Sequence, residues 1–344
     1  MINRILIVGL GSAGTRHLRL ARLFFPNSEI KVFRHRAQSD IPELSNGCFS
    51  RIEEVNQFAP QIAVIANPST FHTQVAYKLA LAKVNLLIEK PISSSVEGVA
   101  ELIKRCKENN LVLMVGYNLR FSTSLKFFRE SLLDGTIGQI LSVRCEVGQY
   151  LPSWRPESDY RQGVSARKEL GGGALLELSH EIDYLRWIFG EVDWVRATLS
   201  KQSRLEIDVE DTVHLTLGFV STNNEKQLVG TLNLDLIRHD RTRMCTVIGE
   251  KGTLRWNGLT GDVDLFELDS SDWKKLYGHE PQRDETYTAE WKDFVEAIEL
   301  RSDPSITGDD GLKALEIIEA ARISAAAGTQ ETISHIDLAN RSPK

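Results

Sequence analysis

The sequence has few cysteines and no long run of apolar residues. Its four cysteines are widely spaced and include no CxxC pair; they are Cys48, Cys106, Cys145 and Cys245. We therefore expect no metal site, no disulfide framework and a reducing, cytoplasmic location. No stretch reaches the roughly 20 apolar residues that span a bilayer. The apolar start of the chain is one strand long and is followed by glycines, so we expect neither a membrane segment nor a signal peptide.

An excess of basic residues is also absent. The chain has 41 Lys and Arg against 47 Asp and Glu, a formal net charge of −6, which argues against nonspecific nucleic-acid binding. The hydrophobic fraction of 42% and the charged fraction of 26% are typical of a globular protein. A length of 344 residues suggests two domains.

The first part of the chain alternates between short apolar runs and segments with helical periodicity. The runs predicted as strands are residues 5–9, 29–34, 61–66, 85–89 and 111–116. Capping-box patterns at Ser50 with Glu53, and at Ser94 with Glu97, predict the starts of two of the intervening helices. Repeated β-α units of this length predict an α/β fold with a doubly wound parallel sheet, here a Rossmann domain over residues 1–120.

The pattern changes near residue 120, and residues 121–344 are predicted to form a second, α+β domain. Several strand-like segments follow one another closely, with Asn223 and Asn224 as turn residues, which predicts a large, open and mainly antiparallel sheet. These segments are residues 140–150, 192–200, 211–220, 226–237 and 244–250. Residues 122–133, the segment after the glycines at 171–173, and 287–327 are expected to be helical, and helices at about 309–327 are candidates for packing back on the first domain.

A glycine-rich loop lies directly after the first predicted strand. Its sequence, Gly9-Leu10-Gly11-Ser12-Ala13-Gly14, fits GxGxxG and opens a predicted helix, which is the context that this dinucleotide-binding motif requires. Glycines allow a tight turn, and backbone N–H groups at a helix N-terminus attract a pyrophosphate. The alternative is an ordinary turn between a strand and a helix. The predicted contacts are Gly9, Gly11, Ser12, Ala13 and Gly14.

The end of the second predicted strand indicates the type of cofactor. An NAD-selective site usually places an acidic residue there, but this chain has Arg34, His35 and Arg36. Guanidinium groups suit a 2′-phosphate. We therefore expect NADP(H) to be preferred, with NAD(H) as the second choice; exposed loop residues without a ligand are the alternative.

Several motifs in order resemble those of the Gfo/Idh/MocA oxidoreductases. Besides the glycine loop, they are Asn67-Pro68-Ser69-Thr70-Phe71-His72, Glu89-Lys90-Pro91, Gly116-Tyr117-Asn118-Leu119-Arg120-Phe121, and the GGG helix with its His and Asp. The resemblance covers nearly the whole chain. It implies oxidation or reduction of a sugar or cyclitol hydroxyl, and a homodimer or homotetramer formed through the C-terminal sheet. It also implies cofactor contacts by Asn67, Pro68, His72, Glu89, Lys90 and Asn118.

In the resembling enzymes, the lysine of Glu-Lys-Pro contacts both the reacting hydroxyl and the cofactor. Lys90 occupies that position and follows a predicted strand at the carboxyl edge of the sheet, where ligands bind in open α/β folds. A cation there can stabilise a developing alkoxide. The alternative is a surface lysine beside a turn.

In the resembling enzymes, the GGG helix brings a histidine and a carboxylate to the nicotinamide. The matching segment here is 171–187, GGGALLELSHEIDYLRW. His180 is the expected general base, since the pKa of an imidazole lies near working pH. Much of the family places Asp four residues before this histidine, but here Glu177 is three before it and residue 176 is leucine. Residues three apart share a helix face, so Glu177 is the expected partner. Glu181 and Asp183 are alternatives, and an Asp183–Arg186 ion pair is a further possibility.

Substrate contacts are expected from the segment before this helix and from the helix itself. Aromatic and cationic side chains suit a sugar that carries phosphate or carboxylate, although a solvated basic loop is nearly as plausible. The candidates are Arg120, Trp154, Arg155, Tyr160, Arg161, Asp183 and Tyr184, together with Lys90. The helix sequence resembles that of a subgroup linked to surface-sugar and nonulosonic-acid pathways.

These features predict a nicotinamide-dependent sugar dehydrogenase or reductase. A glycosidase that uses its nicotinamide for internal redox and elimination is one alternative, and aldose–aldose transfer with retained cofactor is a variant of the main hypothesis. A non-catalytic nucleotide-binding sensor is a third class, which intact Lys90 and His180 argue against. No nucleic-acid or membrane partner is expected.

Overall fold

A computed structural model describes residues 2–34, 41–221 and 226–335 of the chain. The described residues form two compact units. The first contains residues 2–117 and 288–315, and the second contains residues 118–287 and 316–335. The predictions made for His35, Arg36, Asn223 and Asn224 lie outside the described residues.

The first unit is built on a six-stranded parallel sheet with the order β3-β2-β1-β4-β5-β6. Its strands are β1 (Arg4–Val8), β2 (Glu29–Phe33), β3 (Gly47–Phe49), β4 (Ile62–Ile65), β5 (Asn85–Ile88) and β6 (Leu113–Val115). The central strand β1 pairs with β2 on one side and β4 on the other, and its residues from Ile5 to Val8 are buried. Parallel strands that are buried on both faces have continuous apolar sequences, as these do. The parallel strand order confirms the predicted Rossmann sheet.

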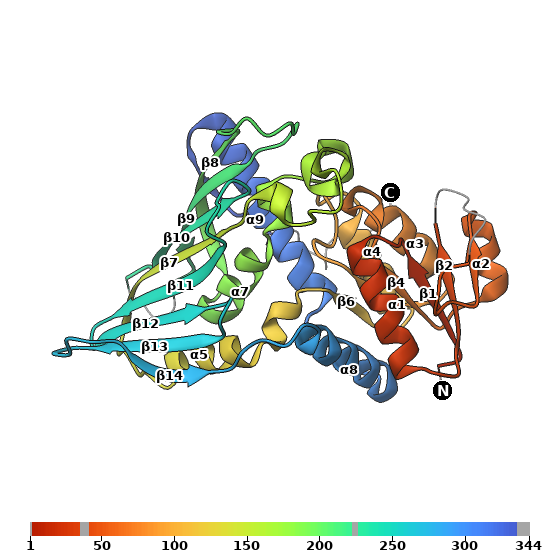
Figure 1. Ribbon diagram of the computed structural model, residues 1–344, viewed down its shortest axis with the longest axis horizontal. Coiled ribbons are helices and arrows are strands. Elements are labelled where there is room, and N and C mark those ends of the chain that lie inside the picture. Colours follow the sequence, from red (N-terminus) through yellow and green to blue (C-terminus); the bar gives the residue numbers. More distant parts are fainter. Residues whose placement is uncertain (1, 35–40, 222–225, 336–344) are drawn as a thin grey trace. The chain divides into compact units, whose positions relative to one another are not determined.

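Helices pack against this sheet (Figure 1), and two of their predicted starts were wrong. The helices of the unit are α1 (Ser12–Phe24), α2 (Ile52–Phe58), α3 (His72–Leu81), α4 (Val99–Glu108) and most of α8 (Glu285–Leu300), with a 3₁₀ turn η1 (Ser69–Phe71) before α3. The cap of α2 is Arg51, whose N–H donates to Glu54 Oε2 at 3.1 Å, one residue later than predicted. Helix α4 begins after Gly98, whose φ of +72° is left-handed, so Ser94 and Glu97 do not cap it.

The second unit is built on a nine-stranded sheet with the order β14-β13-β12-β11-β7-β10-β9-β8-β15. Its strands are β7 (Ile140–Gly148), β8 (Val192–Ser200), β9 (Thr212–Phe219), β10 (Val229–Asp235), β11 (Thr242–Gly249), β12 (Gly252–Asn257), β13 (Asp262–Glu267), β14 (Lys274–Gly278) and β15 (Gln330–Thr332). Among the described strand pairings of this sheet, only β7–β10 is parallel, which confirms a mainly antiparallel sheet. The sequence analysis did not identify β12 to β15.

Helices α5 (Thr123–Leu133) and α7 (His180–Phe189) lie on one side of this sheet, as Figure 1 shows. Helix α9 (Gly308–Ala327) also contacts it, because Ser324 Oγ accepts the N–H of Ala197 on β8. The strands alternate accordingly: on β9, Val213 and Leu215 are buried whereas His214 is exposed. The sheet therefore has one apolar, covered face and one polar face.

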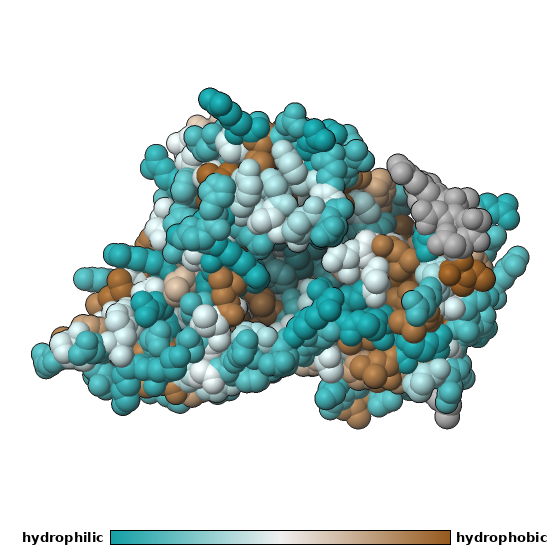
Figure 2. Space-filling view, in the orientation of Figure 1, coloured by the Kyte–Doolittle hydropathy of each residue, from teal (hydrophilic) through white to brown (hydrophobic). Residues whose placement is uncertain are grey.

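Short turns connect these elements. They are η2 (Asn118–Phe121), η3 (Leu151–Ser153), η4 (Tyr160–Gln162), η5 (Val164–Ala166), η6 (Lys168–Leu170) and the four-residue helix α6 (Ala174–Glu177). On the face that Figure 2 shows, apolar side chains are scattered among hydrophilic ones. Within the described part of the chain, no helix is both long enough and apolar enough to cross a bilayer.

Candidate functional site

The three glycines of the GxGxxG loop serve different purposes. Gly9 has a φ of +87°, and a Cβ there would lie 2.8 Å from the carbonyl oxygen of Ala66. A Cβ on Gly14 would lie 2.1 Å from the carbonyl oxygen of Gly9. Both glycines are therefore required by packing within the protein. A Cβ on Gly11 would meet nothing within 4 Å, so only at Gly11 is space kept open for a ligand.

The open position at Gly11 fits the pyrophosphate of a dinucleotide. Gly11 is the N-cap of α1 and has no side chain that could cap the helix. The first turn of the helix contains no acidic residue. Its N–H groups and the positive end of the helix dipole thus favour an anion. Nearby, Asn67 follows β4, and its buried Oδ1 has no hydrogen-bond partner among the described residues. A buried acceptor without a donor is costly, which fits a ligand that supplies one.

Arg34 lies at the carboxyl end of β2, where the sequence analysis placed the cofactor-selecting residue. Its main-chain N–H donates to the carbonyl of Phe49 at 2.9 Å, and its residue surface is half-buried. The structure thus holds the backbone at this point.

Glu89 and Lys90 follow β5, and the carboxylate of Glu89 is held inside the unit. Glu89 Oε1 lies 3.0 Å from Nε2 of His17, and Oε2 accepts the main-chain N–H of Lys90 at 3.2 Å. Burial raises the pKa of Glu89, but the hydrogen bond with His17 and the charge and main-chain N–H of Lys90 oppose that shift, and the net direction is downward. The carboxylate is therefore ionised beside Lys90, which is half-buried.

His72 links the Asn67 loop to the residue after Lys90. Its Nδ1 lies 3.0 Å from the carbonyl oxygen of Pro91, and its Nε2 lies 2.7 Å from that of Asn67. Burial lowers the pKa of His72, whereas the two carbonyls and Glu89 oppose that shift. His72 is 1% exposed, and both of its ring nitrogens face main-chain carbonyl oxygens.

The predicted continuous helix after the three glycines is broken in the structure. Helix α6 ends at Glu177 and α7 begins at His180, with Leu178 and Ser179 between them. Leu178 has φ −103° and ψ 28°, which departs from helical geometry. The expectation that Glu177 and His180 share one helix face was therefore wrong. Both side chains are half-buried.

The glycines before α6 are required by contacts within the second unit. A Cβ on Gly172 would lie 2.3 Å from the carbonyl oxygen of Val164, and one on Gly173 would lie 2.4 Å from Glu210 Oε1. The same oxygen accepts the N–H of Leu175 at 3.0 Å. These glycines let protein atoms approach the start of α6.

Asp183 forms a buried ion pair with Arg120. Arg120 Nε and Nη2 donate to Asp183 Oδ2 and Oδ1 at 2.9 and 2.6 Å, and the two residues are 7% and 1% exposed. Arg186 forms its own bidentate pair with Glu191, with both distances 2.9 Å. The sequence analysis named Arg186 as a possible partner of Asp183, but the bidentate partner of Asp183 in the structure is Arg120.

Glu181 and Tyr184 of α7 are also held from within the unit. Glu181 Oε1 accepts from Nε of Arg243, on β11, at 2.8 Å. The hydroxyl of Tyr184 lies 2.9 Å from Sγ of Cys145, and the residue is fully buried. Burial raises the pKa of Tyr184 well above its usual range. With Glu181 and Asp183 each held by an arginine, Glu177 stays the predicted partner of His180.

The loop from residue 151 to 170 contains several charged side chains that contact one another. Arg161 Nε lies 2.8 Å from Asp159 Oδ1, and Arg161 Nη1 lies 2.9 Å from Glu206 Oε2. Both acids raise the pKa of Arg161. This guanidinium is already paired on an exposed surface, which favours the solvated-loop alternative for it. The other loop residues predicted to contact substrate are Trp154 and Tyr160, which are half-buried, and Arg155, which is exposed.

The sequence analysis missed three buried residues near Glu89. Trp291 of α8 donates through Nε1 to Nδ1 of His17 at 3.0 Å. Glu290 is fully buried, and neither carboxyl oxygen has a hydrogen-bond partner among the described residues. His17 lies three residues after Gly14, a spacing that could have drawn attention to it. No local pattern marks Glu290 or Trp291. Glu89, whose charge acts on Glu290, and His17, which accepts from Trp291, both lie about 200 or more residues away in the sequence.

Across the described residues, no group of three or more His, Cys, Asp or Glu side chains is arranged to hold a metal ion.

Asn118 of η2 donates through Nδ2 to Oγ1 of Thr286 at 2.7 Å. This predicted cofactor contact therefore has a partner within the second unit.

Two family models match the chain. Residues 3–117 match the NAD-binding Rossmann fold of the Gfo/Idh/MocA oxidoreductase family, and residues 129–333 match the C-terminal α/β domain of the same family. The two matches together cover most of the sequence.

Relatives include proteins of different activities. Myo-inositol 2-dehydrogenase of Thermotoga maritima is 26% identical, over 93% of this chain and 96% of that protein. The 2,7-anhydro-N-acetylneuraminate hydratase of Escherichia coli K12 is 30% identical over 38% of this chain and 33% of its own. A solved structure of levoglucosan dehydrogenase with NADH has a TM-score of 0.83 at 22% identity, covering 97% of this chain and all of that one. This last likeness shows a shared fold.

We predict that Gly11→Ala weakens cofactor binding without destabilising the protein. The new methyl group enters open space in the folded chain but occupies the approach of the pyrophosphate, so Kd for NADH should rise about tenfold or more. Nicotinamide fluorescence measures the Kd, and thermal unfolding measures stability.

Gly14→Ala is the matched control for this prediction. Its Cβ would collide with the carbonyl of Gly9, so its Tm should fall by several degrees, in line with an overpacking penalty of about 1–3 kcal/mol. If Gly11→Ala bound NADH as tightly as the wild type, the assignment of Gly11 to the pyrophosphate would be rejected.

Proposed function

This chain belongs to the Gfo/Idh/MocA oxidoreductase family, and we propose from that premise that it transfers hydride between a nicotinamide cofactor and a sugar carbon. The observation that carries the proposal is the position of Lys90 directly after β5, with Glu89 and Pro91 hydrogen-bonded on either side of it. We assign cofactor binding to the domain of residues 1–120, and substrate binding and oligomerisation to residues 121–344.

The proposed cofactor contacts lie at the carboxyl edge of the six-stranded sheet. The open main chain at Gly11, Ser12 and Ala13 receives the pyrophosphate, and Asn67 offers a buried carbonyl oxygen to the nicotinamide half. When bound, the nicotinamide supplies a hydride acceptor or donor. The remaining proposed contacts are Gly9, Gly14, Pro68, His72, Glu89, Lys90 and Asn118.

In this proposal, His180 transfers the proton and Lys90 stabilises the developing negative charge. In oxidation, the neutral imidazole of His180 takes the proton of the substrate hydroxyl, and Glu177 orients the ring. The ammonium of Lys90 stabilises the negative charge that develops on the oxygen. In reduction, the imidazolium of His180 returns the proton.

The proposed substrate is a sugar or sugar derivative. A relative named myo-inositol 2-dehydrogenase, aligned over nearly its whole length, supports a polyhydroxylated ring. For such a ligand, Trp154 and Tyr160 offer apolar surface and Arg155 offers a cation. Arg120, Asp183 and Tyr184 are buried, so we assign them a supporting role behind the residues that contact the ligand. Arg161 can bind the substrate only if its ion pairs with Asp159 and Glu206 break.

A second candidate activity is elimination or hydration with a cofactor that is restored within each turnover. The partial match to an anhydro-sugar hydratase favours it. Such an enzyme would retain nicotinamide through purification and consume the sugar without net NADH formation, which mass spectrometry and absorbance at 340 nm would measure.

We predict that Lys90→Ala and His180→Ala each lower kcat by about 100-fold or more, because each removes a group acting on the transferred proton or the charged oxygen. The assay is NADH or NADPH formation, with each cofactor in turn, on a sugar panel that includes levoglucosan and myo-inositol. NADH binding, followed by fluorescence, should persist in His180→Ala. Lys78→Ala, an exposed change on α3, serves as the control. Wild-type turnover in either variant would remove that residue from the mechanism.

We further propose a preference for NADP(H), with Arg34, His35 and Arg36 binding the 2′-phosphate. Loss of a charged hydrogen bond is worth about 1.5–3 kcal/mol, so Arg34→Ala should weaken NADPH about 10- to 100-fold. NADH lacks that phosphate and should change little. Parallel fluorescence titrations measure both constants, and equal losses for the two cofactors would reject the assignment.

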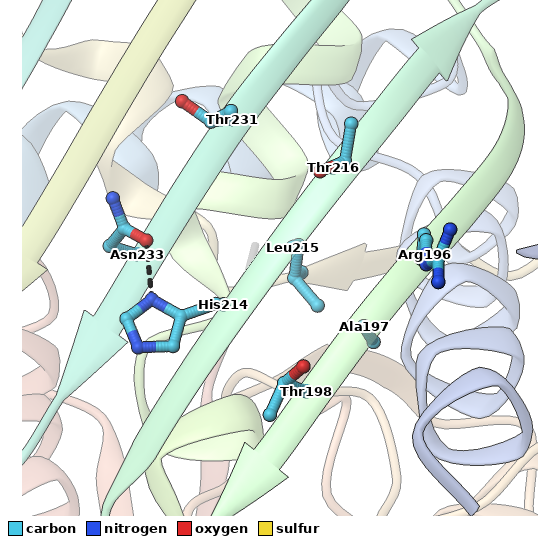
Figure 3. Close-up of a pocket in the computed structure, with 8 residues that line it drawn as sticks. All are labelled: Arg196, Ala197, Thr198, His214, Leu215, Thr216, Thr231 and Asn233. Atoms are coloured by element: carbon cyan, nitrogen blue, oxygen red, sulfur yellow. Dashed lines mark hydrogen bonds between the residues drawn. The ribbon is translucent and has the colours of Figure 1, made fainter. Parts of the chain in front are cut away.

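We also propose a homodimer or homotetramer formed through the polar face of the nine-stranded sheet. A groove of about 320 Å³ crosses β8, β9 and β10 there. Figure 3 shows residues that line it, with His214 hydrogen-bonded to Asn233. Its polar rim includes Arg196, Thr198, Thr216 and Thr231.

Thr216→Arg should disrupt this assembly, because it places a second cation in the groove beside Arg196. Light scattering coupled to size-exclusion chromatography should show a shift toward the 38.7 kDa monomer, while Lys78→Glu leaves the wild-type mass unchanged. A wild-type protein that is itself monomeric would refute the proposal.

A further inference from the structure

We propose that Arg241 binds a carboxylate or phosphate group carried by the sugar, near the end of α7 that begins with His180. Arg241 directly precedes β11, at the end of the segment that connects β10 to β11. The inference rests on the proposed function only in naming the ligand a substrate, because the anion site itself is formed within the second unit alone.

The strand pattern places Arg241 on the covered face of the nine-stranded sheet. Residues two apart on a strand share a face, so Arg241 continues the row formed by Arg243 and Cys245. Arg243 Nε donates to Glu181 Oε1 on α7 at 2.8 Å. Cys245 is fully buried and lies opposite Cys145 of β7 in the strand register. This row therefore lies on the face that α7 covers.

The contacts between β11 and α7 show toward which end of the helix Arg241 lies. Arg243 contacts Glu181, and the cysteine pair two residues further along the sheet contacts Tyr184, one turn later on α7. The strand and the helix therefore run in the same direction along this face. Two residues before Arg243, Arg241 lies toward the first residue of α7, which is His180.

The charge of Arg241 is not neutralised within the described part of the second unit. The other arginines near α7 each have a carboxylate partner on the helix or just beyond it; they are Arg120, Arg186 and Arg243. No hydrogen bond or ion pair joins the side chain of Arg241 to another described residue, and this side chain is exposed. Partial burial and the charge of Arg243 lower the pKa of Arg241, but a guanidinium stays protonated at neutral pH.

The segment before Arg241 is held in place by the opposite, polar face of the sheet. Asp235 Oδ1 accepts the main-chain N–H groups of Ile237 and Arg238 at 3.1 and 2.8 Å. Arg238 Nη1 donates to Oε2 of Glu146 on β7 at 2.8 Å. The chain is thus anchored just before Arg241, which reduces the ordering cost when Arg241 binds an anion.

These features together indicate the chemistry of the ligand. A planar guanidinium can donate two parallel hydrogen bonds to a carboxylate or a phosphate. The second positive charge at Arg243 favours a negative group over a neutral hydroxyl at this position. Because Arg241 lies toward His180, the anion is placed on the same sugar whose hydroxyl reacts. We therefore assign a sugar acid or a sugar phosphate to this site.

The test compares the binding of D-glucuronate, D-glucose 6-phosphate and D-glucose to the full-length protein in the presence of NADH. Saturation-transfer NMR with up to about 20 mM sugar covers Kd values in the millimolar range. At least one anionic sugar should bind about tenfold or more tightly than glucose, and the one that does distinguishes carboxylate from phosphate. Arg241→Gln should remove this advantage and leave the binding of glucose unchanged.

Arg204→Gln is the matched control, because Arg204 is also exposed and its side chain has no partner among the described residues. It lies between β8 and β9 and should keep the full advantage of the anionic sugar. Equal binding of the three sugars to the wild type, or binding of none of them, would overturn the proposal. An undiminished advantage in Arg241→Gln would do so too, and loss of it in Arg155→Gln alone would place the anion on the 151–170 loop.

The binding measurement needs no turnover, so its outcome is separate from that of the proposed function. If Arg241→Gln loses the advantage while the wild type oxidises no sugar, the anion site stands and the dehydrogenase is rejected. If the wild type oxidises neutral sugars and shows no preference for an anionic one, the dehydrogenase stands and the anion site is rejected.

Discussion

The buried ion pair between Arg120 and Asp183 is the constraint on which the second unit's chemistry depends. Both partners are nearly inaccessible to water, and two charged hydrogen bonds join them. Removing one partner of such a pair leaves an uncompensated buried charge, which costs about 3–5 kcal/mol. Asp183 lies one turn after His180 on α7, so the pair fixes the rotation of the turn that carries the proposed general base.

The other charges of α7 act in the same way. Glu181 is joined to Arg243 of β11, and Arg186 is joined to Glu191 just beyond the helix. Ionisable groups in an otherwise apolar helix suggested acid–base chemistry in the sequence, but most of them hold the helix against its neighbours. Planar guanidinium groups suit this task, since a bidentate contact fixes orientation as well as distance.

Local patterns explain why much of the fold was predictable and much of the site was not. The parallel strands and the GxGxxG loop are signalled by adjacent residues, so periodicity was enough to find them. The break between Glu177 and His180 was missed because Gly172 and Gly173 bring Val164 and Glu210 against the chain there, which no helical pattern reveals. The late strands β12 to β15 are short and partly charged, and their pairing is decided by the sheet around them.

Each unit anchors the main chain around one of the two proposed catalytic residues. In the first unit, buried side chains anchor the main chain on both sides of Lys90, and in the second, arginine–carboxylate pairs anchor the helix that begins at His180. Catalytic groups held by their own surroundings lose little freedom on binding, so more of the binding free energy is available for the transition state. In the proposed function, substrate selectivity is assigned to side chains outside these anchors, such as those of the exposed loop around Arg155.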